Sequence, residues 1–328
     1  MFSDQERSVV LRFSVTFCLL VCQGCGGTEE DTSNAADPGA IDMGAVESAA
    51  EDSGVDPQIV AKLVAAGVKA EKIGPTFVYA SDSQITDEHL KLFATMPELK
   101  TLSLGKTKIT GSGLKDLNCP KLRSLLLFDT PVTDAEVSQL PSLPALETLS
   151  LAGTAIDGTC LEKVSNYSAL TALELHNTKV SDAALAPLSK LKALSRLELQ
   201  DTAITDAGLQ PLQDCPELYT LNLANTMVTD DGVIALTQKV QLFNLNLKGT
   251  GVTDKLIENL VGDASQKLCI LRLKGTKLTS ASVAFLGKLQ TLEELDVRDT
   301  GLAESDVALL REGLESLREI NKPEPFEK

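Results

Sequence analysis

The sequence has no tryptophan, and aromatic side chains make up only 4% of its 328 residues. Its apolar fraction of 43% is nevertheless ordinary, so the chain can bury a large core. A core without large rings has to be assembled from leucine, valine, isoleucine and alanine. This composition favours many similar packing layers over one irregular centre, and it argues against sugar recognition, which favours ring stacking.

Positive charge is also scarce. The chain has 30 lysines and arginines against 46 aspartates and glutamates, for a formal net charge of −16. Phosphate binding needs a basic footprint, so nucleic acid and anionic lipid are poor partners for the surface as a whole. Much of the negative charge lies between Gly26 and Asp56, a stretch with nine acidic residues and neither lysine nor arginine. We expect residues 26–55 to form a solvated, self-repelling linker.

Metal-site patterns are absent from the sequence. Seven cysteines are present without the two Cys-x-x-Cys motifs of a zinc site, and the two histidines, His89 and His176, are far apart in the chain. No metal site and no cofactor are therefore predicted.

The apolar run at the N-terminus, from Phe13 to Cys22, is too short to span a membrane. It follows Arg7 and Arg12, as in a secretory signal. Because a glycine and a cysteine come soon after it, residues 1–25 resemble a bacterial lipoprotein signal with Cys25 as the lipidated residue. Such a lipid would tether the chain to a membrane of the cell envelope. A cleaved secreted or periplasmic protein, and an uncleaved anchor or misassigned start, are the alternatives.

A repeat dominates the sequence from Leu99 onward, with a period of 23 or 24 residues. Each unit reads L-x-x-L-x-L-x-x-T-x-(I/V)-T-D-x-x-L-x-x-L. One unit is longer, with its extra residues at 262–264, a degenerate unit precedes the series, and a half unit ends it. The nine full units begin at Leu99, Leu122, Leu146, Leu170, Leu194, Leu218, Leu242, Leu268 and Leu292.

Each unit predicts one strand and one short helix. L-x-L alternates with period two, as in a strand with one buried face. Thr-Asp marks a helix start, because the hydroxyl caps N–H groups and the carboxylate suits the helix dipole; Thr133 to Glu136 reads as a capping box. Proline before several units ends the helix. Neither element can bury its apolar side alone, so stacked units must share one core.

These units resemble the leucine-rich-repeat family. Ile204 to Leu209, which reads ITDAGL, resembles its ribonuclease-inhibitor-like and cysteine-containing members, although threonine stands here where those use cysteine or asparagine. The resemblance implies an α/β fold: a right-handed solenoid, or horseshoe, with a parallel β-sheet on the concave face and short helices on the convex face. We expect a capping helix at 56–75, the repeat domain at 76–321 and a short tail at 322–328.

Three recurring residue types have structural interpretations. The threonine before each helix-start motif is expected to hydrogen-bond turn backbone. The recurring aspartates are interpreted as helix caps rather than cation ligands, which would have to converge on one point. Cys119 and Cys215 lie four coils apart, about 20 Å, too far for a disulfide. The aspartates are Asp134, Asp182, Asp206, Asp230 and Asp254, and the cysteines read as small buried hydrophobes are Cys119, Cys160, Cys215 and Cys269.

The residues between the strand leucines are predicted to point out of the concave face and to bind a partner. The middle coils are acidic with one histidine, the later coils are basic, and two aromatic residues stack at one edge one coil apart. Such a mixture is typical of a protein-binding face. A merely solvated sheet is the alternative. The candidate residues are Glu174, His176, Glu198, Gln200, Tyr219, Asn222, Phe243, Asn246, Lys248, Arg272, Lys274 and Arg298.

The sequence therefore predicts a monomeric, exported and lipid-tethered module that binds a protein and is not an enzyme. The Glu174–His176–Glu198 group has no accompanying nucleophile or oxyanion donor, and no stretch outside the repeats is long enough for a catalytic domain. One alternative is a substrate-receptor subunit like the F-box-associated members of the family, which carry a helical adaptor-binding domain before their repeats. The other alternative is a binder of cell-envelope glycan.

Overall fold

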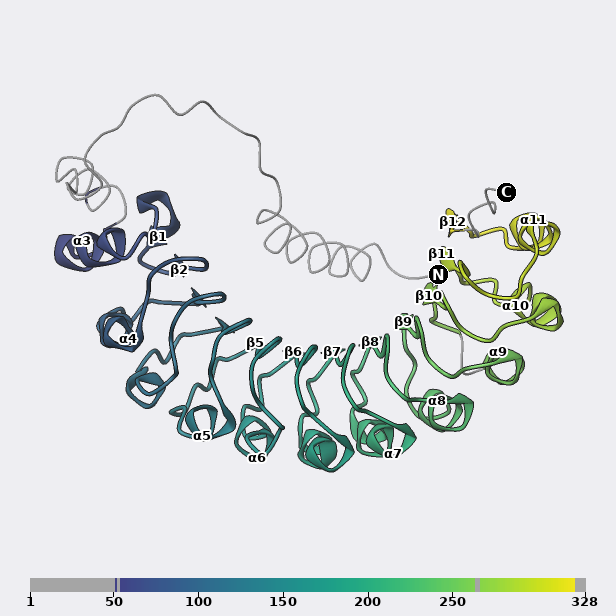
Figure 1. The fold of residues 1–328 in the computed structure, drawn as a ribbon, viewed down its shortest axis with the longest axis horizontal. Coiled ribbons are helices and arrows are strands. Elements are labelled where there is room, and N and C mark those ends of the chain that lie inside the picture. The colour runs from purple at the N-terminus through teal and green to yellow at the C-terminus, as the bar shows by residue number, and fades with distance from the viewer. Residues whose placement is uncertain (1–50, 52–53, 263–265, 322–328) are drawn as a thin grey trace, which may run out of the picture. The chain divides into compact units, whose positions relative to one another are not determined.

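The computed structural model describes residue 51, residues 54–262 and residues 266–321 (Figure 1). The chain divides into two compact units, residues 1–40 and residues 41–328, and every described residue belongs to the second unit. The predicted signal with Cys25, most of the predicted acidic linker, residues 263–265 of the long repeat and the C-terminal tail lie outside the described residues.

Within the described part of the chain, twelve short strands form one sheet, in which they follow each other in chain order. All neighbours are parallel except β1 and β2. The central leucines of β3 to β11 are in register with one another, with Val78 of β2 and with Ile320 of β12, because a slip of one residue would turn them out of the core. The strands are β1 (Ile73–Gly74), β2 (Phe77–Tyr79), β3 (Thr101–Ser103), β4 (Ser124–Leu126), β5 (Thr148–Ser150), β6 (Ala172–Glu174), β7 (Arg196–Glu198), β8 (Thr220–Asn222), β9 (Asn244–Asn246), β10 (Ile270–Arg272), β11 (Glu294–Asp296) and β12 (Glu319–Asn321).

Short helices connect the strands and form the outer layer, while the strands line the inner side of the curved repeat unit (Figure 1). The predicted fold class, a leucine-rich-repeat solenoid with an open parallel sheet, is confirmed by this arrangement. The α-helices are α3 (Pro57–Ala65), α4 (Asp87–Phe93), α5 (Asp134–Val137), α6 (Leu161–Val164), α7 (Asp206–Leu209), α8 (Asp230–Thr237), α9 (Asp254–Leu260), α10 (Val283–Leu286) and α11 (Glu304–Gly313). The 3-10 helices are η1 (Ala70–Lys72), η2 (Leu114–Asp116), η3 (Asp182–Lys190), η4 (Gln210–Asp214) and η6 (Ser280–Ser282).

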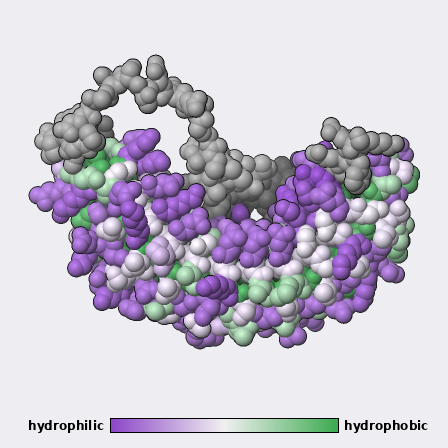
Figure 2. Space-filling model, in the orientation of Figure 1, coloured by the Kyte–Doolittle hydropathy of each residue, from purple (hydrophilic) through white to green (hydrophobic). Residues whose placement is uncertain are grey.

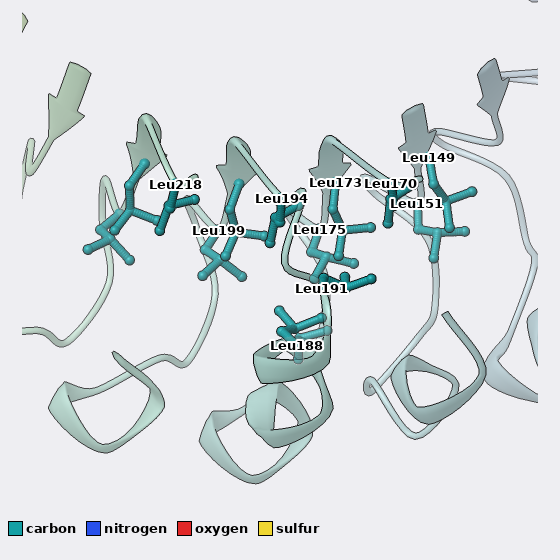
Figure 3. Packing of buried hydrophobic residues seen from close by; sticks show 14 of the residues in the cluster. Leu149, Leu151, Leu170, Leu173, Leu175, Leu188, Leu191, Leu194, Leu199 and Leu218 are labelled. Atoms are coloured by element: carbon teal, nitrogen blue, oxygen red, sulfur yellow. The ribbon is translucent and has the colours of Figure 1, made fainter. Parts of the chain in front are cut away.

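One continuous apolar core runs between the sheet and the helices, from Val55 to Ile320. Equivalent leucines of successive coils stack in rows, so that Leu149 and Leu173, on neighbouring strands, are both fully buried (Figure 3). Each coil buries its apolar side only by covering its neighbour, which is why the coils are stable together. Hydrophilic residues cover most of the outer surface visible in Figure 2, and hydrophobic ones form only small patches there.

A left-handed turn closes the strand segment of every coil. The residue before the threonine has a φ between 52° and 70°, a region that aspartate, asparagine and glycine tolerate best. The sequence carries this signal as a recurring Asp, Asn or Gly in eight of these nine coils, and Lys106 is the exception. These residues are Lys106, Asp129, Gly153, Asn177, Asp201, Asn225, Gly249, Gly275 and Asp299.

The predicted role of the threonine column is confirmed in all nine units. Each hydroxyl donates to the carbonyl oxygen three residues earlier, as Thr226 does to Leu223 at 2.6 Å. The bond ties the turn to the last strand leucine and satisfies a carbonyl inside the coil. The column consists of Thr107, Thr130, Thr154, Thr178, Thr202, Thr226, Thr250, Thr276 and Thr300.

The aspartate column differs from the prediction. These carboxylates do not serve mainly their own helices; each accepts hydrogen bonds from the start of the next coil's helix. Asp230 accepts from the Thr253 amide at 2.8 Å and from the Thr253 hydroxyl at 2.7 Å. Gly232 makes room for the equivalent bond one coil earlier, since a Cβ there would lie 2.3 Å from Oδ1 of Asp206. The contact joins neighbouring coils, which a reading of one coil at a time cannot show.

The four cysteines of the repeats are buried, as predicted. Cys119 donates its thiol hydrogen to the Phe93 carbonyl at 3.2 Å, and Cys215 donates to the Leu188 carbonyl at 3.4 Å. Burial raises the pKa of both thiols to about 11. The capping helix predicted for residues 56–75 is shorter in the structure: α3 begins after Asp56, buries Val60 and Leu63 and ends at Ala65, and η1 and β1 occupy part of the remaining range.

Candidate functional site

The inner face of the sheet, opposite the helices, carries two columns of side chains. The first column consists of the last residue of each strand, and the second lies two residues further along the chain, because alternate strand residues point to the same face. We call this surface the inner face. At β4 it is apolar: Leu126 is buried, and the half-buried Phe128 ring fills the space that a Cβ of Gly105 would need.

Two neighbouring glutamates lie at the centre of the inner face. Glu174 of β6 and Glu198 of β7 are register partners, and each is only 7% exposed. The Glu198 carboxylate accepts from Nε of Arg196 at 2.9 Å and from Nδ2 of Asn222 at 2.8 Å. Both carboxylates thus lie among other side chains on the sheet rather than reaching into solvent.

Glu174 has a different environment from Glu198. Burial raises the pKa of Glu174, and the nearby Ser150 hydroxyl and the charges of Arg196 and His176 offset this rise only in part. The negative charge of Glu198 adds to it. Glu174 is therefore a carboxylate held in a site that disfavours its charge.

Intramolecular ion pairs occupy most of the basic part of the inner face. Arg272 pairs with Glu294 at 2.8 Å, and Arg298 pairs with Asp296 at 2.7 Å. Lys274 pairs with Asp299 at 3.2 Å. The predicted positive half of the face is therefore largely neutralised by acids of this chain.

Further candidates lie in the coils of β8 and β9. Tyr219 and Phe243, which precede β8 and β9, stack with their ring centres 4.7 Å apart and their planes 8° apart. Asn246 is half-buried, and Lys248 is exposed. The two stacked rings hold each other in a fixed orientation.

Several residues that organise this face were not among the predicted ones. Arg196, Asn244 and Glu294 come from the first position of their strands and bond to the predicted candidates Glu198 and Arg272. Their signal in the sequence is the polar residue before each central strand leucine, which points to the same face as the residue after it.

No three His, Cys, Asp or Glu side chains gather as a metal site would require anywhere in residues 54–262 and 266–321. Across the same ranges, none of the helices combines the length and the apolar character needed to cross a bilayer.

Comparison with known proteins identifies the fold. The sequence matches no family model and no curated protein. Among solved structures, an internalin (inlF) of Listeria monocytogenes superimposes with a TM-score of 0.53 at 18% identity, covering 77% of this chain and 74% of that one. An internalin C2 of the same species has a TM-score of 0.45 at 21% identity, with coverages of 85% and 91%. The plant peptide hormone receptor RGFR1 in complex with RGF2 has a TM-score of 0.44 at 20% identity, with coverages of 71% and 41%.

The inlF match concerns the fold alone, as its identity is low. It agrees with the repeated units of the sequence and with the open sheet of parallel strands. The architecture is thus that of the leucine-rich-repeat solenoids.

Proposed function

We propose that this protein is a non-catalytic binding module that holds a protein partner against its inner face. One observation carries the proposal: the inner face is an open surface whose polar and charged side chains are already fixed by contacts within the chain, as Glu198 is by Arg196 and Asn222. A surface ordered in advance loses little conformational entropy when a partner binds.

The composition of the face supports a protein as the partner. Stacked Tyr219 and Phe243 offer apolar area at the rim, and the neighbouring strands offer hydrogen-bonding and charged groups. Tyrosine and arginine are enriched among the residues that dominate binding energy in protein interfaces. We propose as contact residues Glu174, His176, Glu198, Gln200, Tyr219, Asn222, Phe243, Asn246, Lys248, Arg272, Lys274 and Arg298.

Partner capture by the full chain tests this proposal. Replacing Tyr219 with alanine removes one ring of the stacked pair, and we expect capture to fall about tenfold. Phe285 on the outer helix α10 provides a matched control, because F285A also removes a half-buried ring but should leave capture unchanged. K248E on the inner face and K239E after α8 form a second pair, both at exposed lysines. Equal effects within both pairs would overturn the proposal.

We propose further that the module is exported, monomeric and attached to a membrane of the cell envelope through lipid on Cys25. The support is the arrangement of the N-terminal sequence, in which basic residues, a short apolar run and Gly24-Cys25 follow one another. Mass spectrometry of the mature N-terminus tests it. A chain that begins with a diacylated Cys25 agrees with the proposal, whereas an unmodified Cys25 within a longer chain contradicts it.

A further inference from the structure

Three buried side-chain atoms in the described residues have no hydrogen-bond partner, and all three lie together on the inner face. They are Nδ1 of His176, Oε1 of Gln200 and Oγ of Ser150, whose hydroxyl also lies close enough to the Glu174 carboxylate to lower the pKa of Glu174. Ser150, Glu174 and Glu198 end the adjacent strands β5, β6 and β7 and are paired in register. His176 lies two residues after Glu174 and Gln200 lies two residues after Glu198, so the three residues belong to three neighbouring coils of the inner face.

The described residues contain no other group of buried side-chain atoms without hydrogen-bond partners. Every other buried side-chain nitrogen or oxygen in residues 54–262 and 266–321 has a partner, as in the threonine column and in the contacts between neighbouring coils. A buried polar atom without a partner destabilises a fold, so a native cluster of them calls for an explanation. A ligand group that completes the hydrogen bonds provides one.

The chemistry of the cluster selects the kind of group. Oε1 of Gln200 can only accept a hydrogen bond, and the Glu174 carboxylate also accepts when ionised. Nδ1 of a neutral His176 accepts when the proton is on Nε2, and the Ser150 hydroxyl can do either. The complementary group is therefore a cation with several donors.

We propose that Ser150, Glu174, His176 and Gln200, which we call the acceptor cluster, receive the guanidinium of an arginine on the protein partner. The proposal rests on the function proposed above and names the group that the partner inserts. A guanidinium presents several N–H donors in one plane and is weakly hydrated, so it suits a half-buried site better than an ammonium.

The surroundings agree with such a ligand. The inner face already holds guanidinium groups of this chain against carboxylates, as in the Arg196–Glu198 and Arg298–Asp296 pairs. Burial raises the pKa of Glu174, and an arriving cation would favour its ionised form. In the second column, the small side chains of Ala152 and Ala224 lie on either side of His176 and Gln200.

Histidine-selective NMR of the full chain tests the proposal, because the protein has only two histidines and His89 lies on helix α4. The probe is N-acetyl-arginine amide at physiological salt, which screens non-specific attraction to this acidic protein. We expect a saturable shift of the His176 ring signals, with a dissociation constant on the order of millimolar for a single side chain, and no shift at His89.

Three comparisons make the test specific. N-acetyl-citrulline amide has the same shape without the charge and should bind at least about tenfold more weakly, as should N-acetyl-lysine amide. E174Q and Q200A should each weaken arginine binding about tenfold, whereas E319Q, at an exposed carboxylate on β12, should not. Circular dichroism verifies that each variant is folded.

Equal shifts with citrulline, equal binding of lysine, or no response of His176 to arginine would overturn the proposal; in the last case the cluster holds water only. These outcomes are distinguishable from failure of the proposed function. If Y219A abolishes partner capture while E174Q and Q200A leave it unchanged, the inner face binds the partner and the acceptor cluster does not.

Discussion

Glu174 and Glu198 show how the immediate surroundings of one residue decide its effect on the fold. They are adjacent on the sheet and equally buried. Glu198 accepts two hydrogen bonds from neighbouring side chains, whereas burial is the dominant influence on Glu174 and raises its pKa. The same side chain therefore stabilises the protein at one position and strains it at the next.

We expect E174Q to increase the free energy of unfolding at pH 7 by about 1 kcal/mol, because it removes the charge that burial disfavours. E198Q should decrease it, since it weakens two charge-assisted hydrogen bonds. Urea denaturation of the two variants measures both effects. A loss of stability in E174Q comparable to that in E198Q would refute the distinction between the two sites.

The pH dependence of the E174Q effect has a definite sign. A carboxyl group whose folded pKa is raised contributes stability below its unfolded pKa, here the ordinary value of 4.5, and loses it as the pH rises through the folded pKa. Ionisation of Glu174 therefore lowers the free energy of unfolding of the wild-type protein only at pH values above the unfolded pKa of 4.5. The advantage of E174Q at pH 7 should disappear below about pH 4, where both side chains are neutral.

A threonine of the turn column allows a second prediction at this scale. T226V keeps the shape of the side chain but removes the hydrogen bond to the Leu223 carbonyl, which is 2.6 Å long. We expect a loss of about 1 kcal/mol in the free energy of unfolding. T220V, at a half-buried threonine on β8, is the control and should change stability much less. Similar losses in both variants would show that the hydroxyl bond contributes little.

At the scale of the strand and the helix, hydrogen bonds between neighbouring coils stabilise the fold in addition to the contacts within each coil. The carboxylate at the first turn of one helix binds the N-terminus of the next, so neighbouring coils share their helix ends. At Asp87 and Asp134, burial raises the pKa of the carboxyl, but hydrogen bonds from the following coil outweigh it and hold the pKa below the usual 3.8. Their stabilisation is present above pH 3.8 and is lost as the pH falls through the lowered pKa.

Adjacent aspartates on helix α8 test this connection. D230A removes two hydrogen bonds to Thr253 and should lower the free energy of unfolding by about 2 kcal/mol. D231A removes only an exposed ion pair with Lys255, so the urea midpoint should stay where it is in the wild type. If both variants unfold at the wild-type midpoint, the carboxylate does not join the coils.

The strands and helix starts were predictable because leucine spacing and Thr-Asp are local signals. The left-handed residue of the turn was also marked in the sequence, as Asp, Asn or Gly in every full unit except the one with Lys106, but its meaning depends on the backbone path. The role of Asp230 was not predictable, because its partner, Thr253, belongs to another coil and comes within reach only when the coils stack. Local patterns thus indicate the elements, and stacking decides their contacts.

Contacts that form only when the coils stack also limit what the sequence predicts about the inner face. The spacing of leucines indicated which residues share the inner face, and the structure places Glu174 and Glu198 there. The leucine spacing could not indicate that Arg272 and Arg298 pair with acids of this chain, because folding has to bring Glu294 and Asp296 beside them. Nor could it indicate unpartnered atoms such as Oε1 of Gln200, since hydrogen-bond satisfaction depends on the distances between side chains.

At the scale of the whole molecule, the coils form a one-dimensional array in which each coil contacts its neighbours and the inner face crosses all of them. A partner that lies along this face contacts several coils at once. The outer side, in contrast, consists of separate short helices, one or two in each coil. The account therefore assigns recognition to one side of the molecule.

Hydroxyl-radical footprinting of the full chain with its captured partner tests that assignment most directly, because it measures the accessibility of side chains on both sides together. The account predicts that the partner slows oxidation of Tyr219, Phe243 and His176, while Leu309, which is 58% exposed on helix α11, reacts as before. Protection of Leu309 with unchanged reactivity of the three inner residues would contradict the account.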